Sequence, residues 1–239
     1  MCKILTLTNT SKIKKLDHAI NVIAEYITET EVDGFGYAIQ GTKGVFGERT
    51  LKTEDFRTCF NTPILNAPFV NQSYNRFGIK GLGFGPAIFH GRTSTNHKTL
   101  INTHPIVKNG WTLIHNGVVS NHGPKYEMIT TNDTEHLVQY MSTTGISDIE
   151  KYITGYYAVS ALTPDGTLVV FKDSIASLYC AYVETIESYM FATTESLIQN
   201  VCKDLKWKHS TIEQVNDDIY IEFRGNEIVK MEDINPPGS

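Results

Sequence analysis

The sequence predicts an α+β fold in which a few helices pack against mostly antiparallel sheets. Three observations favour this class. Short segments of alternating or continuous apolar residues are numerous, and turn-forming residues separate them at short intervals. Segments with the apolar spacing of an amphipathic helix are few. Turns suited to hairpins outnumber connections suited to crossovers, which argues against a doubly wound parallel sheet.

The amino-terminal part of the chain is expected to form a strand, a helix, a hairpin and another strand. Residues 2–8 alternate apolar and polar side chains, which predicts a strand. Apolar residues recur at helical spacing through residues 15–28, which predicts an amphipathic helix. Two short strands flank residues 41–44 and form the expected hairpin. Glycines at 78, 81, 83 and 85 mark a loop before a strand at residues 87–90.

The rest of the chain is expected to place two further helices among strands. One helix covers residues 134–141, where Asn132 and Asp133 can cap the first turn, and the other covers residues 195–205. Residues 164–166, Pro-Asp-Gly, predict a turn between two strands. The expected strands lie at residues 111–119, 155–162, 167–171, 178–183, 189–192, 218–223 and 227–231.

Composition narrows the possible partners. The chain has 239 residues and a formal net charge of -5, which argues against a nucleic-acid-binding face because such faces are basic. No apolar run approaches the roughly 20 residues needed to cross a bilayer, and the first residues are too polar for a secretory signal. We therefore expect a cytoplasmic protein without nucleic-acid or membrane partners. A single domain over residues 1–235 with a loose tail at 236–239 fits the sequence.

Four cysteines are present, and their spacing excludes the usual zinc and redox motifs. They form no C-x-x-C pair, and disulfides are unexpected in a reducing compartment. Cys59, Cys180 and Cys202 are interpreted as small apolar residues of the core. Cys2 differs because it directly follows the initiator methionine.

Cys2 could combine a nucleophile with its own base. A residue as small as cysteine after Met1 normally permits removal of the methionine, so that the mature chain would begin with Cys2. An α-amine has a pKa of about 7.7–8.0, which suits a general base near neutral pH. The amine could then take the proton of the thiol on the same residue.

Asn116 and Gly117 could stabilise the charge that such a nucleophile creates. A thiolate that attacks an amide produces a tetrahedral oxyanion, which needs hydrogen-bond donors already in place. The asparagine offers a side-chain amide and the glycine an unobstructed backbone N–H. The alternative is an ordinary Asn-Gly hairpin turn, although the flanking residues do not pair as a regular hairpin.

Arg92 and Asp133 are candidates for binding a substrate with two opposite charges. The guanidinium of Arg92 suits a carboxylate, and the carboxylate of Asp133 suits an amine. The alternative for Arg92 is a surface salt bridge. The alternative for Asp133 is a helix cap.

These residues occur within short pieces that together resemble the class II glutamine amidotransferases, of the N-terminal-nucleophile hydrolase superfamily. The resemblance covers most of the chain, and the pieces occur in the order typical of the family. They are "MC" at the start, "DGFGYAI" at 33–39, "HGRTST" at 90–95, "NTHP" at 102–105, "HNGVVSN" at 115–121, "NDTE" at 132–135 and "FATTES" at 191–196.

The resemblance implies a four-layer αββα sandwich of two mostly antiparallel sheets and an enzyme that hydrolyses the side-chain amide of glutamine. Cys2 would be the nucleophile and, through its α-amine, the base. Asn116 and Gly117 would form the oxyanion hole. The products would be glutamate and ammonia, and neither a metal nor a cofactor would be needed.

The resemblance also assigns the substrate-binding residues. Arg92 would bind the glutamine carboxylate, and Asp133 would hold the α-amino group. Thr95 would line the same pocket in a loop that closes over the substrate. Asn102 and His104 would shape the wall of the pocket, with a structural role for both.

The sequence departs from the family pattern at three positions. Lys3 stands where glycine is common, Thr93 where an aromatic residue is frequent, and Asn96 where some members have histidine. Thr93 is still placed among the substrate-binding residues. The departures put the closing contacts of the loop in doubt and remove no residue that the chemistry requires.

Alternatives remain open for the base and for the fate of the ammonia. His104 or His115 could serve as the base of a Cys–His pair. Three functions are compatible with the sequence. The chain could hydrolyse glutamine and deliver ammonia to a separate synthase, it could hydrolyse another γ-glutamyl compound without transfer, or it could bind glutamine without catalysis. The oligomeric state and the ammonia acceptor are not indicated.

Overall fold

The computed structural model describes residues 2–29, 33–41, 44–51, 84–93, 98–147 and 149–234. These residues form three α-helices: α1 (Leu16–Thr28), α2 (Thr134–Thr143) and α3 (Glu195–Leu205). The strands are β1 (Lys3–Leu7), β2 (Gly34–Gly41), β3 (Gly44–Thr50), β4 (Phe84–Arg92), β5 (Ile106–Lys108), β6 (Trp111–Asn121), β7 (Ile153–Leu162), β8 (Leu168–Lys172), β9 (Tyr179–Val183), β10 (Ser188–Ala192), β11 (Glu213–Gln214), β12 (Ile219–Arg224) and β13 (Glu227–Asp233). Short 3-10 turns are η2 (Leu100–Asn102), η3 (Ile149–Lys151) and η4 (Glu184–Ile186).

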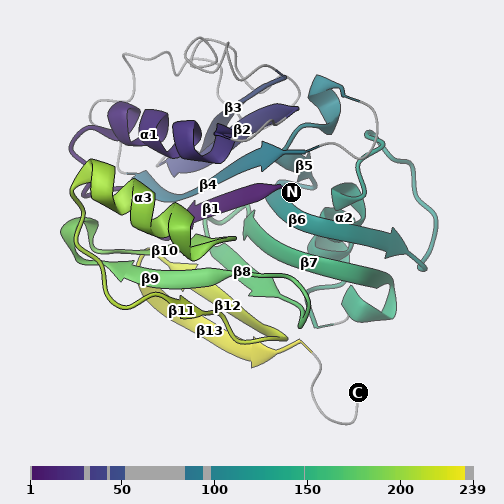
Figure 1. The fold of residues 1–239 in the computed structure, drawn as a ribbon. Helices are drawn as coiled ribbons and strands as arrows, with labels where there is room; N and C mark the ends of the chain where they lie inside the picture. The colour runs from purple at the N-terminus through teal and green to yellow at the C-terminus, as the bar shows by residue number, and fades with distance from the viewer. Residues whose placement is uncertain are drawn as a thin grey trace.

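The strands form two sheets in which every described pairing is antiparallel. The first sheet has seven strands in the order β11-β9-β10-β1-β4-β2-β3, and the second has six in the order β13-β12-β8-β7-β6-β5. Figure 1 shows β1, from the amino-terminal end of the chain, inside the first sheet with β4 on one side and β10 on the other. The predicted α+β class with mostly antiparallel sheets is confirmed.

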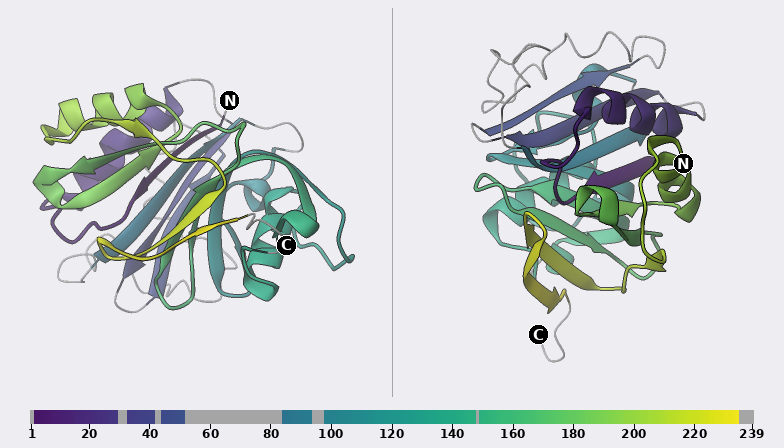
Figure 2. Two further views of the ribbon diagram at one scale, coloured as in Figure 1. Left: turned by 90° about the horizontal axis from the view of Figure 1, so that it is seen from below. Right: turned by 90° about the vertical axis from the view of Figure 1, so that its left-hand side faces the viewer.

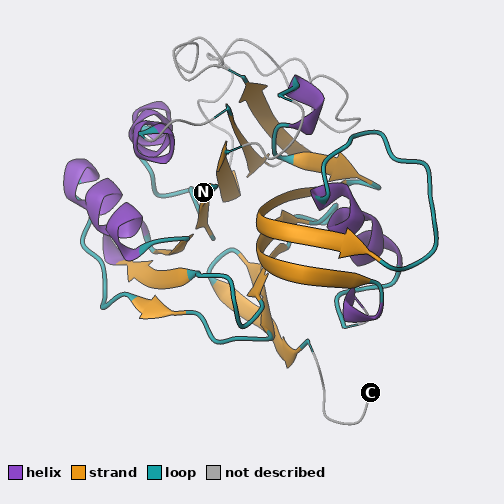
Figure 3. Cartoon of the chain, turned by 45° about the vertical axis from the view of Figure 1, so that its right-hand side comes forward, coloured by secondary structure: helices purple, strands orange, loops and turns teal. Residues whose placement is uncertain are grey.

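The two sheets are stacked between layers of helices. Helices α1 and α3 contact each other and cover the outer face of the seven-stranded sheet, whereas α2 packs on β5 and β6 of the other sheet. Figures 2 and 3 show these helices on opposite sides of the molecule. A third apolar cluster lies between the sheets and includes Ile88 from β4 and Ile114 from β6. The predicted four-layer αββα sandwich is confirmed.

The alternation of side chains along β1 explains how one strand serves two layers. Leu5 and Leu7 pack under α1 and α3, whereas Ile4 belongs to the cluster between the sheets. Thr6 also points between the sheets, where its hydroxyl donates to the Ser160 hydroxyl on β7 at 2.8 Å. The period of two therefore fixes the face of each residue and holds β1 tightly in the centre of the fold.

The predicted elements are confirmed within the described residues, with small shifts at their ends. The structure adds β5 and β11, which are too short to give a periodic signal. Asn109 and Gly110 form the tight turn between β5 and β6, both with positive φ, of 51° and 80°. Such angles are typical of an Asn-Gly hairpin turn.

Two of the cysteines have the expected core positions. Cys202 is buried in the cluster beneath α3, and Cys180 is partly buried against the cluster between the sheets. Burial raises the pKa of each thiol to about 12, so both remain protonated near neutral pH.

Several predictions fall outside the described residues. They concern Cys59, the glycines at 78, 81 and 83, the middle of the hairpin at 42–43, and the tail at 236–239. Across the part of the chain that is described, no helix has the length and apolar character needed to cross a membrane.

Gly36 is required where β2 passes the segment that leads into β5. A Cβ atom built on Gly36 would lie 2.1 Å from the carbonyl oxygen of His104 and 2.9 Å from that of Glu48. Since both obstacles are backbone atoms, we expect Gly36→Ala to lower the free energy of unfolding by more than about 3 kcal/mol. Gly85→Ala is the matched control, because its Cβ would meet Gln40 at an ordinary 3.5 Å.

Urea denaturation of the two variants measures this difference. Gly85→Ala should stay within about 1 kcal/mol of the parent protein. Equal stability of the two variants would show that the close approach at Gly36 does not constrain the fold.

Candidate active site

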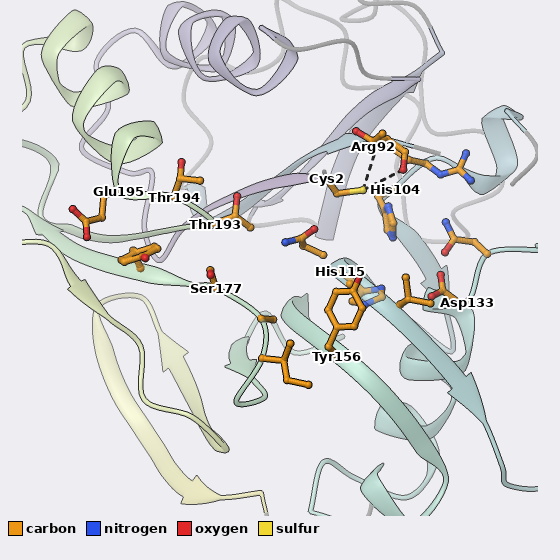
Figure 4. Close-up of a pocket in the computed structure, with 18 of the residues that line it drawn as sticks. Cys2, Arg92, His104, His115, Asp133, Tyr156, Ser177, Thr193, Thr194 and Glu195 are labelled. Atoms are coloured by element: carbon orange, nitrogen blue, oxygen red, sulfur yellow. Dashed lines mark hydrogen bonds between the residues drawn. The ribbon is translucent and has the colours of Figure 1, made fainter. Parts of the chain in front are cut away.

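A cavity of about 720 Å³ opens where the two sheets meet the start of the chain. Five of the residues singled out from the sequence line it together: Cys2, Arg92, Asn116, Gly117 and Asp133. They come from the start of β1, the end of β4, the middle of β6 and the start of α2. Figure 4 shows Cys2 near the centre of the view, with Arg92, His104 and Asp133 to one side. Tertiary structure therefore gathers residues that are far apart in the sequence.

Cys2 is held by the backbone of the segment that follows β4. The register of β1 and β4 pairs Lys3 with Gly91, which brings Cys2 opposite Arg92 and beside Thr93. The backbone N–H of Thr93 donates to Cys2 Sγ at 3.3 Å, and Sγ lies 3.5 Å from the Thr93 carbonyl oxygen. Thr93 thus contacts the thiol through its main chain.

The surroundings of Cys2 keep its thiol protonated. Burial raises the pKa of Cys2, while the Thr93 N–H, the chain's amino terminus and the nearby Arg92 guanidinium oppose the rise. The carboxylate of Asp133 adds to the increase. Since burial prevails, the thiol needs a base before it can act as a nucleophile.

Arg92 is buried at the end of β4 rather than at the surface. Arg92 is only 4% exposed, so the alternative of a surface salt bridge is wrong. Burial lowers the pKa of its guanidinium, and the negative groups of Cys2, Asp33 and Asp133 oppose this shift. The group nevertheless remains charged, since arginine is not deprotonated in proteins at ordinary pH. A buried positive charge beside the thiol suits the carboxylate of a bound ligand.

Asn116 and Gly117 lie in the middle of β6, where they pair with Ala158 and Tyr157 of β7. Gly117 has a φ of 150°, and a Cβ there would lie 1.9 Å from the carbonyl oxygen of Tyr156. The backbone can therefore take this path only at a glycine. The alternative of a hairpin turn at Asn116-Gly117 is wrong, because the Asn-Gly turn of this hairpin is at residues 109–110.

Asp133 joins the start of α2 to β6. One carboxylate oxygen accepts the Val119 N–H at 2.9 Å, and the other accepts the Thr134 N–H at 3.1 Å. The side chain of Asn132 also accepts from the Thr134 N–H, at 3.0 Å. Asp133 therefore caps α2, as the alternative interpretation predicted, through its contact with the Thr134 N–H, and it also binds β6 through the Val119 N–H. The same carboxylate lines the cavity, where its remaining lone pairs can meet a ligand.

Asn102 forms part of the scaffold behind this helix start. Its side chain donates to the Thr131 hydroxyl at 2.7 Å and accepts the Thr131 N–H at 3.0 Å. Its carbonyl oxygen accepts from the side chain of Asn132 at 2.7 Å. Asn102 is not among the described residues that line the cavity, so it supports the site from behind instead of shaping the wall as predicted.

Three buried histidines and one threonine form a cluster under the cavity. Thr134 Oγ1 lies 2.6 Å from His104 Nε2 and 3.2 Å from His115 Nδ1. His90 stacks on His104 with ring centroids 3.8 Å apart, and His90 Nε2 lies 3.0 Å from the His115 carbonyl oxygen. Sequence reasoning missed Thr134 and His90, although Thr134 directly follows Asp133 and His90 opens the motif that contains Arg92.

Burial keeps this cluster neutral. It lowers the pKa of His90 to about 3, and it lowers the pKa values of His104 and His115 as well. A neutral ring nitrogen that is already bonded to Thr134 is a poor general base near neutral pH. In the described part of the chain, the His, Cys, Asp and Glu side chains form no group arranged to hold a metal ion.

The opposite wall of the cavity was not predicted. Ser177 precedes β9 and Tyr179 is its first residue, whereas Thr193 and Thr194 join β10 to α3 and Glu195 is the first residue of α3. The motif at residues 191–196 marked this region but gave none of its residues a role. Thr95, which was predicted to close over the substrate, lies outside the described residues.

Comparison with solved structures identifies the fold. The glutamine phosphoribosylpyrophosphate amidotransferase from B. subtilis, complexed with ADP and GMP, matches 98% of this chain with a TM-score of 0.68 and 16% identity. This chain spans only 49% of that protein. No family model matches the sequence, and no curated protein matches it.

Two matching structures are about as long as this chain. A class-II domain protein from Silicibacter pomeroyi, described as a glutamine aminotransferase, matches 98% of this chain and 100% of its own, with a TM-score of 0.53 and 12% identity. A predicted glutamine amidotransferase from Pseudomonas aeruginosa PA01 matches 96% of this chain and 95% of its own, with a TM-score of 0.50 and 14% identity. At such identities the likeness establishes the fold, which is that of class II glutamine amidotransferases, and the predicted resemblance is confirmed at that level.

The hydroxyl of Thr134 is expected to stabilise the histidine cluster. Thr134→Val keeps the shape of the side chain but leaves two buried ring nitrogens without this partner. Each unsatisfied buried polar group costs about 1–3 kcal/mol. The free energy of unfolding should therefore fall by about 1 kcal/mol or more. Thr143→Val is the matched control, because Thr143 is an exposed residue of the same helix. A Thr134 variant as stable as the Thr143 variant in urea denaturation would contradict these hydrogen bonds.

Proposed function

We propose that this chain is a glutamine amidotransferase-type amidohydrolase, in which Cys2 hydrolyses the side-chain amide of glutamine. The convergence of five residues on one cavity carries the proposal. Cys2 supplies the nucleophile, and Asn116 and Gly117 supply donors for an oxyanion. Arg92 and Asp133 supply opposite charges for an amino acid. A fold shared with class II glutamine amidotransferases supports the same activity.

The charges of the cavity fit the two ends of an amino acid. The guanidinium of Arg92 binds the α-carboxylate of glutamine, and the carboxylate of Asp133 binds its α-ammonium group. Both groups are fixed, since Arg92 is buried at a strand end and Asp133 is hydrogen-bonded to β6 and α2. His104 belongs to the wall beneath the ligand, and Thr93 presents its backbone to the thiol. Thr95 would complete the pocket from the loop that follows.

Hydrolysis proceeds in two balanced steps. Cys2 Sγ attacks the amide carbon while its proton passes to the base, and the side chain of Asn116 and the N–H of Gly117 stabilise the oxyanion. The tetrahedral species then collapses, the C–N bond breaks, and the protonated base gives its proton to the departing ammonia. Water adds to the resulting thioester, releases glutamate and restores the thiol.

The α-amine of a processed amino terminus is the proposed base. Burial raises the pKa of the Cys2 thiol, so few molecules hold a thiolate near neutral pH and a base is needed. Burial lowers the pKa values of His104 and His115, and the described hydrogen bonds of Cys2 Sγ join it to Thr93 and to neither ring, which disfavours the Cys–His alternative. An α-amine on Cys2 itself has a pKa near 7.7–8.0 and lies within reach of the sulfur.

The fate of the ammonia is part of the same proposal. We place the protein in the cytoplasm and expect a separate synthase to take up the ammonia. A binding module without catalysis is disfavoured, because the nucleophile, the oxyanion donors and both charged groups are all present at the cavity. Co-purification from the native host would identify the synthase, and recovery of the chain alone would argue against one.

Removal of the Cys2 thiol tests the catalytic role. Glutamate release from glutamine should fall by at least about three orders of magnitude in Cys2→Ala, because the nucleophile is lost. Cys180→Ala is the matched control, since that thiol lies outside the cavity. Intact mass of the active protein should show that Met1 has been removed. Equal release by the parent protein and Cys2→Ala, or full activity with methionine retained, would contradict the mechanism.

Removal of the Asn116 amide tests the oxyanion hole. Asn116→Ala should lower kcat for glutamine by about 10²–10³-fold while KM changes little, because the lost hydrogen bond forms in the transition state. Asn121→Ala removes the same side chain further along β6, away from the cavity, and should keep kcat. An effect of Asn116→Ala on KM alone would assign the amide to ground-state binding.

A further inference from the structure

The cavity is larger than the proposed substrate requires. Its volume is about 720 Å³, and cavities of about 300–1,000 Å³ accommodate drug-sized ligands. Free glutamine is much smaller than such a ligand. Arg92 and Asp133, which would hold its α-carboxylate and α-amine, lie to the same side of Cys2 (Figure 4). The amide carbon must reach the sulfur, so the atoms beyond that carbon point to the other side.

The part of the cavity beyond the sulfur has its own wall. Figure 4 shows Ser177, Thr193, Thr194 and Glu195 on the side of Cys2 opposite to Arg92 and Asp133. We refer to these four residues as the far wall. Three of them carry hydroxyl groups that can donate and accept hydrogen bonds, and the fourth is a carboxylate. The wall is therefore polar.

The charge of the far wall favours a cation. Arg92 is the only lysine or arginine among the described residues that line the cavity. Glu195 is exposed, and no ion pair within the described part of the chain neutralises its side chain. The amino end of α3 carries a partial positive charge, but the Thr194 hydroxyl already accepts the Leu197 N–H at 3.2 Å. The full charge of Glu195 then dominates.

Apolar side chains at the same cavity suit an aliphatic linker. Val118, Tyr156 and Ile175 line the cavity and are among the exposed large apolar residues of the molecule, with Ile175 72% exposed. Exposed apolar surface that rims a polar pocket is typical of a ligand-binding site. Val118 and Tyr156 pair with each other beside Gly117, but Ile175 stands two residues before Ser177. A chain of methylene groups that leads toward the far wall could therefore lie against Ile175 and gain from its burial.

We infer that the natural substrate is a γ-glutamyl amide whose amine portion carries a second, positively charged group, and that the far wall binds that portion. The inference rests on the proposed amide hydrolysis at Cys2 and, for the natural substrate, replaces the proposed delivery of ammonia to a synthase. The γ-glutamyl part occupies the half with Arg92 and Asp133, and the charged end of the amine faces Glu195. Glutamine is then the smallest member of the substrate class.

The chemistry is the same as for glutamine and needs no further reactant. Cys2 Sγ forms a bond to the amide carbon, and the C–N bond breaks. The base returns the thiol proton to the departing nitrogen, so that a diamine leaves in place of ammonia. Water then hydrolyses the γ-glutamyl thioester to glutamate and the free thiol. No ammonia is produced from such a substrate.

Three amides of closely matched length test the inference with one readout, the release of glutamate. They are the γ-glutamyl amides of 1,4-diaminobutane, butylamine and 4-aminobutanoate, which end in an ammonium, a methyl and a carboxylate group. The ammonium amide should have the highest kcat/KM, above glutamine, and should exceed the carboxylate amide by roughly 10-fold, because each exposed charge contact is worth up to about fivefold. The difference should appear mainly in KM.

Variants of Glu195 assign the preference to the far wall. Glu195→Gln should reduce the ratio of kcat/KM for the ammonium amide over the butylamide by about 2- to 5-fold, and Glu195→Lys should make the carboxylate amide the better of the two charged substrates. Glu184→Gln is the matched control, because Glu184 is an exposed residue of η4 outside the cavity. It should leave the ratio unchanged.

The outcomes separate this inference from the proposed activity. Release of glutamate from glutamine, with the three amides poorer than glutamine or indifferent to their terminal charge, would overturn the inference and leave the hydrolytic function intact. That result would instead favour a partner protein covering the far wall. No release from glutamine or from any amide would overturn both. A preference for the ammonium amide that persists in Glu195→Gln would remove the far wall from the explanation.

Discussion

The antiparallel pairing of β1 with β4 is the constraint on which the site depends. It fixes Lys3 opposite Gly91, so the first residues of the chain are anchored in the centre of a sheet instead of at its edge. The thiol of Cys2 then meets the backbone of Thr93, and the guanidinium of Arg92 lies beside it. A chain terminus is normally mobile, and only such anchoring can give it the fixed geometry that nucleophilic catalysis needs.

A second junction holds the parts that face the thiol. Asp133 accepts a hydrogen bond from β6, and Thr134 connects His104 to His115. Because His115 directly precedes Asn116, the same contacts fix the position of the proposed oxyanion donor. The neutral state of the histidines follows from their burial. The junction therefore adds no positive charge near Arg92 that would compete for a substrate carboxylate.

The sequence predicted the fold and one half of the site, for different reasons. Periodic apolar patterns locate strands and helices, and short motifs located Cys2, Arg92 and Asp133. The Asn-Gly pairs show the limit of local patterns, since Asn109-Gly110 makes the hairpin turn and Asn116-Gly117 lies within a strand. The choice depends on β7, which pairs with β6 from a distant part of the chain. The motifs at 132–135 and 191–196 contain Thr134 and Glu195 but give neither a role, because their contacts arise only when separate elements meet.

The two halves of the cavity differ in how they are built, and this difference bears on what each can do. Around Arg92 and Asp133 the side chains are buried or hydrogen-bonded to two elements, so a substitution there disturbs the fold as well as the ligand. The far wall stands on connections between strands and helices, and Glu195 makes no tertiary ion pair within the described residues. Thr194 caps α3 and the Thr193 hydroxyl accepts a backbone N–H of β1, but Glu195 is exposed and can change without loss of stability. Under the proposed substrate class, the thiol end would keep one chemistry while Glu195 would set which amine is released.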